Sequence, residues 1–262
     1  MKKKIALIFG VTGQDGSYLA EFLLKKKYIV IGTSKNLSNK KLWRLKKLNI
    51  KKKIIFKKLN ICRISEIKKI IKRFKVSEIY NLAAQSYVSK SFSIPLQTAN
   101  VNALGVIKIL ESIRIINPKI KFYQASSSEI FGNTKNKSYK IYDNFNPQSP
   151  YAISKLFGHN ITKNFRDSFG LYAVSGILFN HDSPLRSKDF VTKKIIVGLI
   201  KIKKNKKKFI ELGNIYAKRD WGYAKEFIPQ IWKMMQLRKP EDFIIATGKS
   251  YSIKQFINIA AL

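Results

Sequence analysis

The sequence is poor in the residues that would define several common protein classes. Cys62 is the only cysteine among 262 residues, so an intramolecular disulfide is excluded, and no Cys/His spacing of the metal-binding type is present. No apolar run reaches the roughly 18 to 20 residues that a membrane span needs. The apolar start of the chain runs into Gln14 and Asp15 without a small-residue cleavage site. We therefore expect a cytoplasmic protein without a metal or a membrane segment.

Acidic residues are also scarce. The chain has 15 Asp and Glu against 52 Lys and Arg, a formal net charge of +37, and such a balance is typical of proteins that bind nucleic acid or anionic surfaces. The lysines, however, form short runs spread along the chain, such as 25–27, 51–53 and 206–208. Two interpretations stay open: a compositional bias at solvated positions, or a positive field that attracts an anionic nucleotide. We expect no specific nucleic-acid partner.

What the sequence does contain begins with a glycine turn. Gly10, Gly13 and Gly16 lie between an apolar run, 5–9, and a helical pattern, 17–24. This order predicts a buried strand, a tight turn and a helix whose free N–H groups bind a pyrophosphate. Glycine suits such a turn because positive φ, close approach to a ligand and close packing of the helix are all needed there.

Apolar strands alternate with amphipathic helices through the first two thirds of the chain. This alternation predicts an α/β fold with a Rossmann-type doubly wound parallel sheet, whose ligands bind at the carboxyl ends of the strands. We assign 1–180 to this dinucleotide-binding domain, and 181–262 to a smaller, partial substrate-binding lobe interleaved with it. Further strands are expected at 28–33, 53–56, 78–84, 122–126 and 172–178, and helices at 65–74, 98–116 and 150–168.

The end of the second strand indicates which dinucleotide binds. Many NAD enzymes place an acidic residue about 20 residues after the glycines, where it binds the ribose 2′-hydroxyl. This chain has Ser34-Lys35-Asn36 there. No carboxylate repels a 2′-phosphate and Lys35 can meet it, so we predict NADP. The alternative, that Lys35 is one more surface lysine, stays open.

The candidate chemistry lies at a strand end and on one helix. The fifth strand leads into residues 126–129, Ser-Ser-Ser-Glu, and the following helix carries Tyr151 and Lys155 four residues apart on one face. A free tyrosine has a pKa near 10. A neighbouring ammonium and a positively charged nicotinamide both favour the phenolate and so lower that pKa. We therefore expect Tyr151 to act as a base at neutral pH.

Six segments of the chain together resemble the GDP-mannose 4,6-dehydratase family, a group of extended short-chain dehydrogenases/reductases in the NAD-dependent epimerase/dehydratase superfamily. The resemblance continues through 245–248 and covers nearly the whole chain. It implies conversion of GDP-α-D-mannose to GDP-4-dehydro-6-deoxy-D-mannose and water by internal hydride transfer through NADP, in GDP-fucose and deoxyhexose synthesis. The segments are 10–24 (with Gln-Asp-Gly-Ser-Tyr-Leu), 80–86, 124–129, 149–155, 176–184 (with Asn-His-Asp-Ser-Pro) and 219–222.

The resemblance also implies a role for each site residue. Tyr151 takes the proton of the sugar 4-hydroxyl and Lys155 holds the nicotinamide ribose. Ser127 hydrogen-bonds the 4-oxygen, and Glu129 removes the C5 proton and helps water to leave from C6. Substrate contacts are implied for Asn180, Lys194 and Arg219, and a homo-oligomer, a dimer or tetramer, is expected. Cofactor contacts are implied for Gly10, Val11, Thr12, Gly13, Gln14, Asp15, Gly16, Lys35, Asn36, Asn60, Ile61, Leu82, Ala83, Ala84, Gln85, Ser86, Lys155, His181 and Arg186.

The chain departs from the family pattern at several positions. Ser127 stands where threonine is usual and keeps the hydroxyl. Lys35-Asn36 replace paired arginines, which removes the bidentate fork expected for a 2′-phosphate. Asn60 replaces an aspartate beside adenine, and Gln97 replaces a tyrosine near the cofactor. Family members also continue past the position of Leu262, so an incomplete substrate lobe is expected.

Three other functions stay open. A related nucleotide-sugar dehydratase is expected to have an Asp-Glu pair in place of Ser128-Glu129, and an epimerase does not need Glu129. The chain could also be a truncated, inactive remnant of the family. A basic nucleic-acid-binding Rossmann module is the third, and its affinity for mixed-sequence DNA would fall steeply with salt.

Overall fold

The computed structural model describes residues 3–132, 138–206 and 208–262. In these ranges the main sheet has seven parallel strands in the order β3-β2-β1-β4-β5-β6-β9. The first six match the predicted strands to within a few residues, and their order confirms the Rossmann-type doubly wound sheet. The strands are β1 (Ile5–Phe9), β2 (Ile29–Ser34), β3 (Ile55–Lys58), β4 (Glu78–Asn81), β5 (Lys121–Ala125), β6 (Ala173–Leu178) and β9 (Phe243–Ile245).

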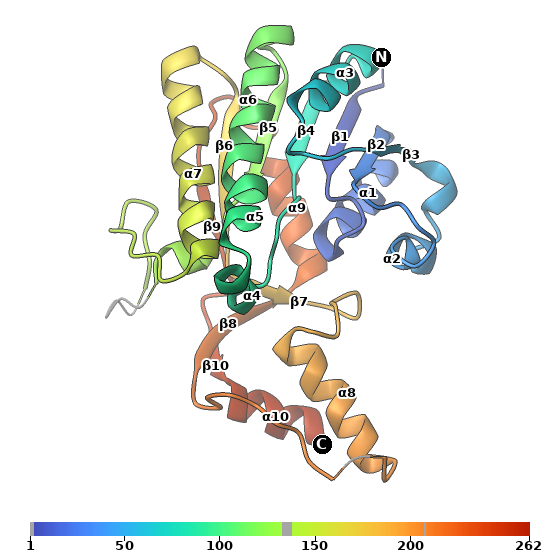
Figure 1. Ribbon diagram of the computed structural model, residues 1–262, viewed down its shortest axis with the longest axis vertical. Coiled ribbons are helices and arrows are strands. Elements are labelled where there is room, and N and C mark those ends of the chain that lie inside the picture. Colours follow the sequence, from blue (N-terminus) through green and yellow to red (C-terminus); the bar gives the residue numbers. More distant parts are fainter. Residues whose placement is uncertain (1–2, 133–137, 207) are drawn as a thin grey trace.

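Helices cover both faces of this sheet (Figure 1). One layer contains α3, α6 and α7, and the other contains α1 and α9, with α2 beside α1. Short connections and right-handed crossovers place successive helices in this way. The bounds are α1 (Gln14–Lys25), α2 (Trp43–Lys47), α3 (Ile64–Phe74), α6 (Gly105–Ile116), α7 (Pro150–Phe169) and α9 (Ala224–Met234).

Each face of the sheet has its own hydrophobic core. Side chains alternate across a strand, so Leu7 and Phe9 of β1 pack with Ile79 under the α3–α6 layer. Ala6 and Ile8 of the same strand pack under α1 and α9 instead. Because both of its faces are buried, β1 reads as a continuous apolar run, which is typical of central strands in parallel sheets.

The helix expected over 98–116 is interrupted. α5 (Pro95–Ala99) runs into a π-helical turn, η2 (Asn100–Leu104), before α6 begins. At this turn the backbone lies close to α7, because a Cβ on Gly158 would be 3.2 Å from the Asn102 carbonyl oxygen. The expectation of one regular α-helix was therefore wrong here, and such π turns are frequent beside functional sites.

A smaller lobe lies beyond the carboxyl ends of the main strands (Figure 1). Its sheet has the order β10-β8-β7. After β8 the chain returns to the main sheet through α9 and β9, which pairs in parallel with β6, and it then re-enters the lobe as β10 and α10. The boundary at residue 180 stays a prediction, since residues after it contribute to both sheets. The lobe consists of β7 (Asn180–Asp182), α8 (Val191–Lys203), β8 (Lys218–Tyr223), β10 (Ser250–Ser252) and α10 (Ile253–Ala261).

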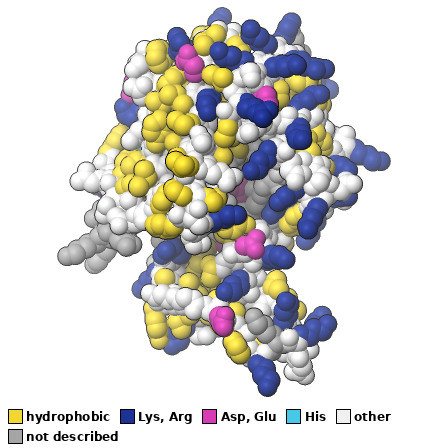
Figure 2. All heavy atoms as spheres, viewed as in Figure 1, with side chains coloured by type: hydrophobic (Ala, Val, Ile, Leu, Met, Phe, Trp, Pro, Cys, Tyr) yellow, Lys and Arg dark blue, Asp and Glu magenta, His cyan; other side chains and the backbone are white. Residues whose placement is uncertain are grey.

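The surface separates apolar from basic side chains. Figure 2 shows hydrophobic side chains gathered over the α5–α7 side of the view, with Lys and Arg spread over the rest of it. Phe92, Leu96 and Ile153 are exposed to 61, 81 and 57%. Within the described ranges, no helix is both long and apolar enough to cross a membrane.

Candidate active site

The glycine turn after β1 has the predicted strand-turn-helix form. Gly10 adopts a φ of +83°, and a Cβ there would lie 2.8 Å from the backbone of Leu82 and Ala83. A Cβ on Gly16 would lie 2.4 Å from the Gly10 carbonyl oxygen. Gly13 is the N-cap of α1 and brings no side chain to the free N–H groups of the helix start. This cradle fits the pyrophosphate of a dinucleotide.

A cavity of about 650 Å³ opens at the carboxyl ends of the central strands. Each segment that was predicted to carry chemistry contributes to its wall, so the structure brings the catalytic and part of the cofactor residues together. The predicted residues that line it are Asp15, Leu82, Ala84, Ser86, Ser127, Glu129, Tyr151, Lys155, Asn180, His181 and Arg186.

Tyr151 and Lys155 project from the first turns of α7. The helix begins after Ser149, whose Oγ accepts a hydrogen bond from the Ala152 N–H at 3.1 Å, an N-cap that fixes the start of the helix. Lys155 is 5% exposed, and its Nζ donates to the Ala125 carbonyl oxygen at 2.9 Å. The same Nζ lies 5.8 Å from the centroid of the Tyr151 ring. The ammonium is therefore fixed between the end of β5 and the phenol.

Burial governs the proton affinity of this pair. Burial raises the pKa of Tyr151 to about 12; a hydrogen bond with Ser127 opposes the rise, and the negative charge of Glu129 adds to it. Burial lowers the pKa of Lys155 to about 8, with Asp15 acting in the opposite direction. The lowered tyrosine pKa expected from the sequence is thus not produced by this chain alone, because loss of solvent outweighs the hydrogen bond.

Asp15 and His181 form an ion pair at the start of α1. The His181 Nε2 lies 3.0 Å from Asp15 Oδ2, and Nδ1 lies 2.7 Å from the Phe179 carbonyl oxygen. Burial by itself disfavours the charged ring, but Asp15 and this carbonyl raise the pKa of His181. Burial likewise opposes ionisation of Asp15, yet attraction to His181 lowers its pKa to about 2. Both ring nitrogens face acceptors, which favours the charged imidazolium, and the ring joins β7 to the glycine turn.

Several predicted residues lie outside the cavity. Lys35 and Asn36 are exposed at the end of β2, and Asn60 follows β3 at the same edge of the sheet. Lys194 on α8 and Arg219 on β8 are exposed on the lobe. Lys35, Asn36 and Asn60 follow β2 and β3, the strands beside the glycine turn. This is the position expected for the adenosine half of a dinucleotide.

Sequence analysis missed Arg44, on α2. Its Nε donates to the Leu185 carbonyl oxygen at 2.6 Å and its Nη1 donates to the Thr12 carbonyl oxygen at 3.0 Å. The guanidinium therefore joins the glycine turn to the segment after β7 and places a cation beside the phosphate cradle. Arg44 stands in one basic stretch among many, so nothing in the sequence distinguished it.

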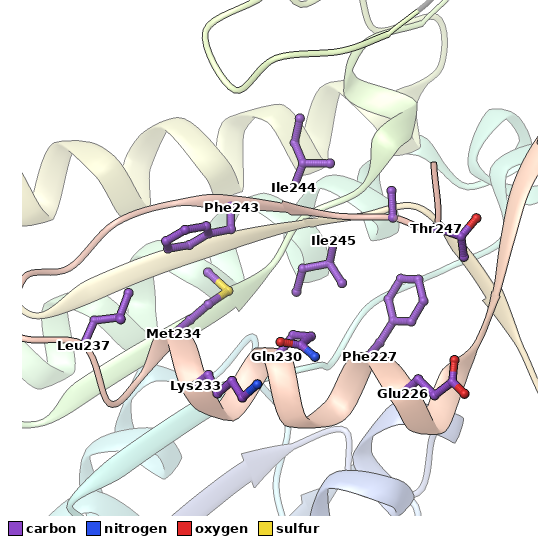
Figure 3. Close-up of a pocket in the computed structure, with 11 residues that line it drawn as sticks. Glu226, Phe227, Gln230, Lys233, Met234, Leu237, Phe243, Ile244, Ile245 and Thr247 are labelled. Carbon is purple, nitrogen blue, oxygen red and sulfur yellow. The ribbon is translucent and has the colours of Figure 1, made fainter. Parts of the chain in front are cut away.

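A second cavity, of about 590 Å³, lies between α9 and β9. Figure 3 shows Phe227 and Met234 rising from α9 toward Ile245 and Phe243 of β9. The remaining lining is Glu226, Gln230, Lys233, Leu237, Ile244, Ala246 and Thr247, which includes none of the predicted site residues. The candidate chemistry therefore belongs to the first cavity.

The strand order, the glycine turn and the Tyr151–Lys155 pair define the class: a short-chain dehydrogenase/reductase fold of the epimerase and dehydratase type. A UDP-N-acetylglucosamine 4-epimerase from Methanobrevibacter ruminantium has this fold, with a TM-score of 0.87 and 26% identity over 99% of this chain and 81% of that chain. So does a dTDP-glucose 4,6-dehydratase from Bacillus anthracis in complex with NAD, with a TM-score of 0.85 and 21% identity over 98% and 80%.

The chain belongs to the GDP-mannose 4,6-dehydratase family, which confirms the resemblance seen in its motifs. The family model described as GDP-mannose 4,6 dehydratase matches residues 7–262. The GDP-mannose 4,6-dehydratase of Vibrio cholerae serotype O1 is 44% identical over 268 residues, which cover 100% of this chain and 72% of that protein. GDP-mannose 4,6 dehydratase 1 of Arabidopsis thaliana is 43% identical, over 98% and 74%.

Proposed function

We propose that this protein converts GDP-α-D-mannose to GDP-4-dehydro-6-deoxy-D-mannose and water, with NADP as the hydride carrier. The observation that carries this proposal is the cavity that gathers a phenol, an ammonium, a hydroxyl and a carboxylate beside a phosphate cradle. The reaction needs one base at the 4-hydroxyl and one acid–base group between C5 and C6, and Tyr151 and Glu129 provide them.

The groove suits a dinucleotide along its length. Residues 10–16 would hold the pyrophosphate and Lys155 the nicotinamide ribose, with His181 and Arg186 as cations beside the phosphates. A dinucleotide held in this way would supply the hydride chemistry of the reaction, at C4 and then at C6 of the sugar. NADP is preferred over NAD in this proposal because Lys35 and Arg44 provide cations near the end of β2 and the glycine turn.

Tyr151, Ser127 and Lys155 act at the sugar 4-oxygen. The Tyr151 phenolate accepts the proton of the 4-hydroxyl, and the Ser127 hydroxyl donates a hydrogen bond to the same oxygen. Forming the phenolate in this buried site requires positive charge, because burial raises its pKa to about 12. Lys155 supplies one charge, and the nicotinamide ring of a bound oxidised dinucleotide would supply a second.

Glu129 acts at C5 and C6. A ketone at C4 acidifies the C5 proton, and the Glu129 carboxylate removes that proton. The resulting carboxylic acid then protonates the 6-hydroxyl, which leaves as water. C5 regains a proton as the hydride reaches C6, and the proton that Tyr151 took from the 4-hydroxyl balances this step. Glu129 and Tyr151 line the same cavity, where both groups can reach one sugar ring.

The lobe supplies the proposed substrate contacts. Asn180 of β7 lines the cavity, where its amide can hydrogen-bond sugar hydroxyl groups. Lys194 and Arg219 are exposed cations on α8 and β8, and the GDP diphosphate is the anionic part of the substrate that they would meet.

The direct test is incubation of the purified protein with NADP and GDP-mannose, with mass spectrometry of the sugar nucleotide. We expect a 4-keto-6-deoxy product, no comparable turnover of dTDP-glucose, and loss of product with Glu129→Gln. Glu211→Gln, at an exposed position on the lobe, is the matched control and should retain activity. The assignment of Glu129 is wrong if both variants perform like the parent, and the function is wrong if the parent binds NADP but forms no product.

A homo-oligomer is also proposed. Phe92, Leu96 and Ile153 are exposed apolar side chains on α4 (Val88–Ser93), α5 and α7, and they form the surface on which two copies of the chain would meet. Leu96→Lys should shift the protein toward the monomer in sedimentation velocity, and an unchanged sedimentation coefficient would contradict this interface. The cytoplasmic location expected from the single cysteine stays a prediction.

A further inference from the structure

The two walls of the active-site cavity are joined by four residues, here called the clasp: Tyr87, Ser187, Asp189 and Phe190. Tyr87 belongs to the loop between β4 and α4, and the other three lie between β7 and α8. The Tyr87 hydroxyl donates to Asp189 Oδ2 at 3.1 Å and lies 3.2 Å from Ser187 Oγ. Ser187 Oγ donates to the same carboxylate oxygen at 2.9 Å. The rings of Tyr87 and Phe190 stack with centroids 4.7 Å apart.

The sheet side of the clasp is anchored through Gln85. Its side-chain Oε1 accepts from the Tyr87 N–H at 2.6 Å, and its Nε2 donates to the Tyr87 carbonyl oxygen at 3.0 Å. The Asn102 side chain holds Gln85 in the same manner: Oδ1 accepts from the Gln85 N–H at 2.8 Å, and Nδ2 donates to the Gln85 carbonyl oxygen at 3.0 Å. Asn102 lies in the π-helical turn η2, so this turn positions the side chain that holds Gln85.

The lobe side of the clasp is anchored through Arg186. Its guanidinium carbon lies 3.6 Å from the centroid of the Phe190 ring, which is therefore held between a cation and Tyr87. The Arg186 Nε forms an ion pair with Asp182 Oδ1 at 2.7 Å. Thr192 Oγ1, at the start of α8, donates to the other Asp182 oxygen at 2.9 Å. Both ends are thus fixed to regular structure.

The clasp lies where the proposed reaction needs the cavity to stay closed. This inference rests on that proposed function. Tyr87, Arg186, Asp189 and Phe190 all line the cavity that contains Tyr151 and Glu129. The hydride that leaves C4 must return to C6 of the same sugar. If the walls separate in between, the reduced dinucleotide and the 4-keto sugar escape and the turnover is lost. A link between the walls slows that escape without touching the reacting atoms.

We propose that the clasp keeps the cavity closed between the two hydride transfers, with Tyr87 and Asp189 as positioning residues that slow ligand release. Tyr87→Phe removes the hydroxyl and keeps the stack, and Asp189→Asn removes the charge that receives both hydrogen bonds. Asp189 is exposed, so loss of its hydrogen bond should accelerate release by roughly two- to fivefold. Because the two residues share one interaction, the double variant should release little faster than either single variant.

The test has two readouts. The first is the dissociation rate of bound NADPH, followed by stopped-flow fluorescence after mixing with excess NADP. The second is the amount of free NADPH, separated by ultrafiltration, per 4-keto-6-deoxy product formed from GDP-mannose. We expect faster dissociation and more free NADPH in both variants, at an unchanged melting temperature. Tyr142→Phe, at a position 92% exposed, is the matched control and should behave like the parent.

The outcomes separate this inference from the proposed function. Parent-like dissociation and parent-like NADPH loss in Tyr87→Phe and Asp189→Asn would overturn the clasp while leaving the dehydratase intact. A lowered melting temperature with an unchanged dissociation rate would assign the two residues to stability alone and also overturn it. A parent protein that binds no NADPH would contradict the proposed function instead.

Discussion

The sheet side and the lobe side of the active-site cleft hold their functional residues with different rigidity. On the sheet side, Tyr151 and Lys155 are 8 and 5% exposed, and packed backbone fixes each. On the lobe side, Lys194 and Arg219 are exposed, and α10 contains no buried residue. The packed helix α7 holds Tyr151 and Lys155 against the sheet, whereas α8 and β8 leave Lys194 and Arg219 in solvent.

This difference separates chemistry from recognition. Groups that act on the transition state gain most from being held in place before the substrate arrives. Groups that attract a flexible diphosphate can act through charge from a mobile side chain. Substitutions on the sheet side should therefore lower kcat, and substitutions on the lobe side should raise KM.

The largest expected effect is that of Tyr151→Phe. Removing the phenol eliminates the base at the 4-hydroxyl, and general-base loss costs roughly 10² to 10⁴ in rate. We expect kcat to fall by this factor while GDP-mannose binding, measured by calorimetry, stays within a few-fold of the parent. A variant that weakens binding and retains kcat would show that the sheet side also serves recognition.

Gly16→Ala should have the next largest effect. Its Cβ would lie 2.4 Å from the Gly10 carbonyl oxygen and 2.8 Å from the Val11 Cα, so the turn must shift, at a cost of about 1–3 kcal/mol. We expect a lower melting temperature and loss of dinucleotide fluorescence. Gly213→Ala on the lobe is the matched control, because its Cβ would meet no atom within 4 Å. Equal losses of melting temperature and dinucleotide binding in both variants would contradict the difference between the sheet side and the lobe side.

Asp15→Asn should give an intermediate effect with a defined pH dependence. The pKa of Asp15 is about 2 in the folded protein, below its usual value of 3.8. The ion pair therefore stabilises the fold above pH 3.8 for as long as His181 is protonated. The contribution is lost as the pH falls toward 2, and also as the pH rises through the raised pKa of His181. One pKa unit corresponds to about 1.4 kcal/mol, so the variant should lose about 2 kcal/mol between these limits.

The same variant should lower the pKa of His181, since Asp15 is the charge that raises it against burial. With two histidines in the chain, imidazole NMR resolves this titration, and His159→Gln assigns the second signal. An unmoved His181 titration would show that the pair does not hold the proton.

Arg219→Ala should have the smallest effect. The guanidinium is exposed and donates to the carbonyl oxygen of its own neighbour, Lys218, at 2.8 Å, so its loss should change the free energy of unfolding by less than about 0.5 kcal/mol. We expect a rise in KM for GDP-mannose of less than about tenfold, with kcat unchanged. A drop in kcat similar to that of Tyr151→Phe would place Arg219 among the chemical groups.

Local patterns were sufficient to predict much of this molecule. The six predicted strands needed only apolar runs and spacing, because all of them except the edge strand β3 are largely buried. The Tyr151–Lys155 pair followed from helical spacing together with its position after the glycine turn and the serine-rich end of the fifth strand. Glu129 could be assigned a role only through the resemblance, since a serine run at a strand end is otherwise an ordinary polar loop.

The features that could not be predicted depend on contacts between distant segments. β9 has three residues, too few for a periodic pattern, and its place is set by pairing with β6. Arg44 gains its importance from Thr12 and Leu185, 32 and 141 residues away. Tyr87 meets Asp189 across 102 residues. No short stretch of sequence contains Arg44 with its two partners, or Tyr87 with Asp189. The many lysines and arginines of the chain also make a single important cation hard to recognise.

Isotope tracing tests the central claim most directly: one cavity removes a hydride from C4 and returns it to C6 of the same sugar. GDP-mannose labelled with deuterium at C4 should give a 4-keto-6-deoxy product with one deuterium at C6, detected by NMR and mass spectrometry. A product that carries no deuterium at C6, or deuterium recovered in free dinucleotide in proportion to turnover, would contradict the account.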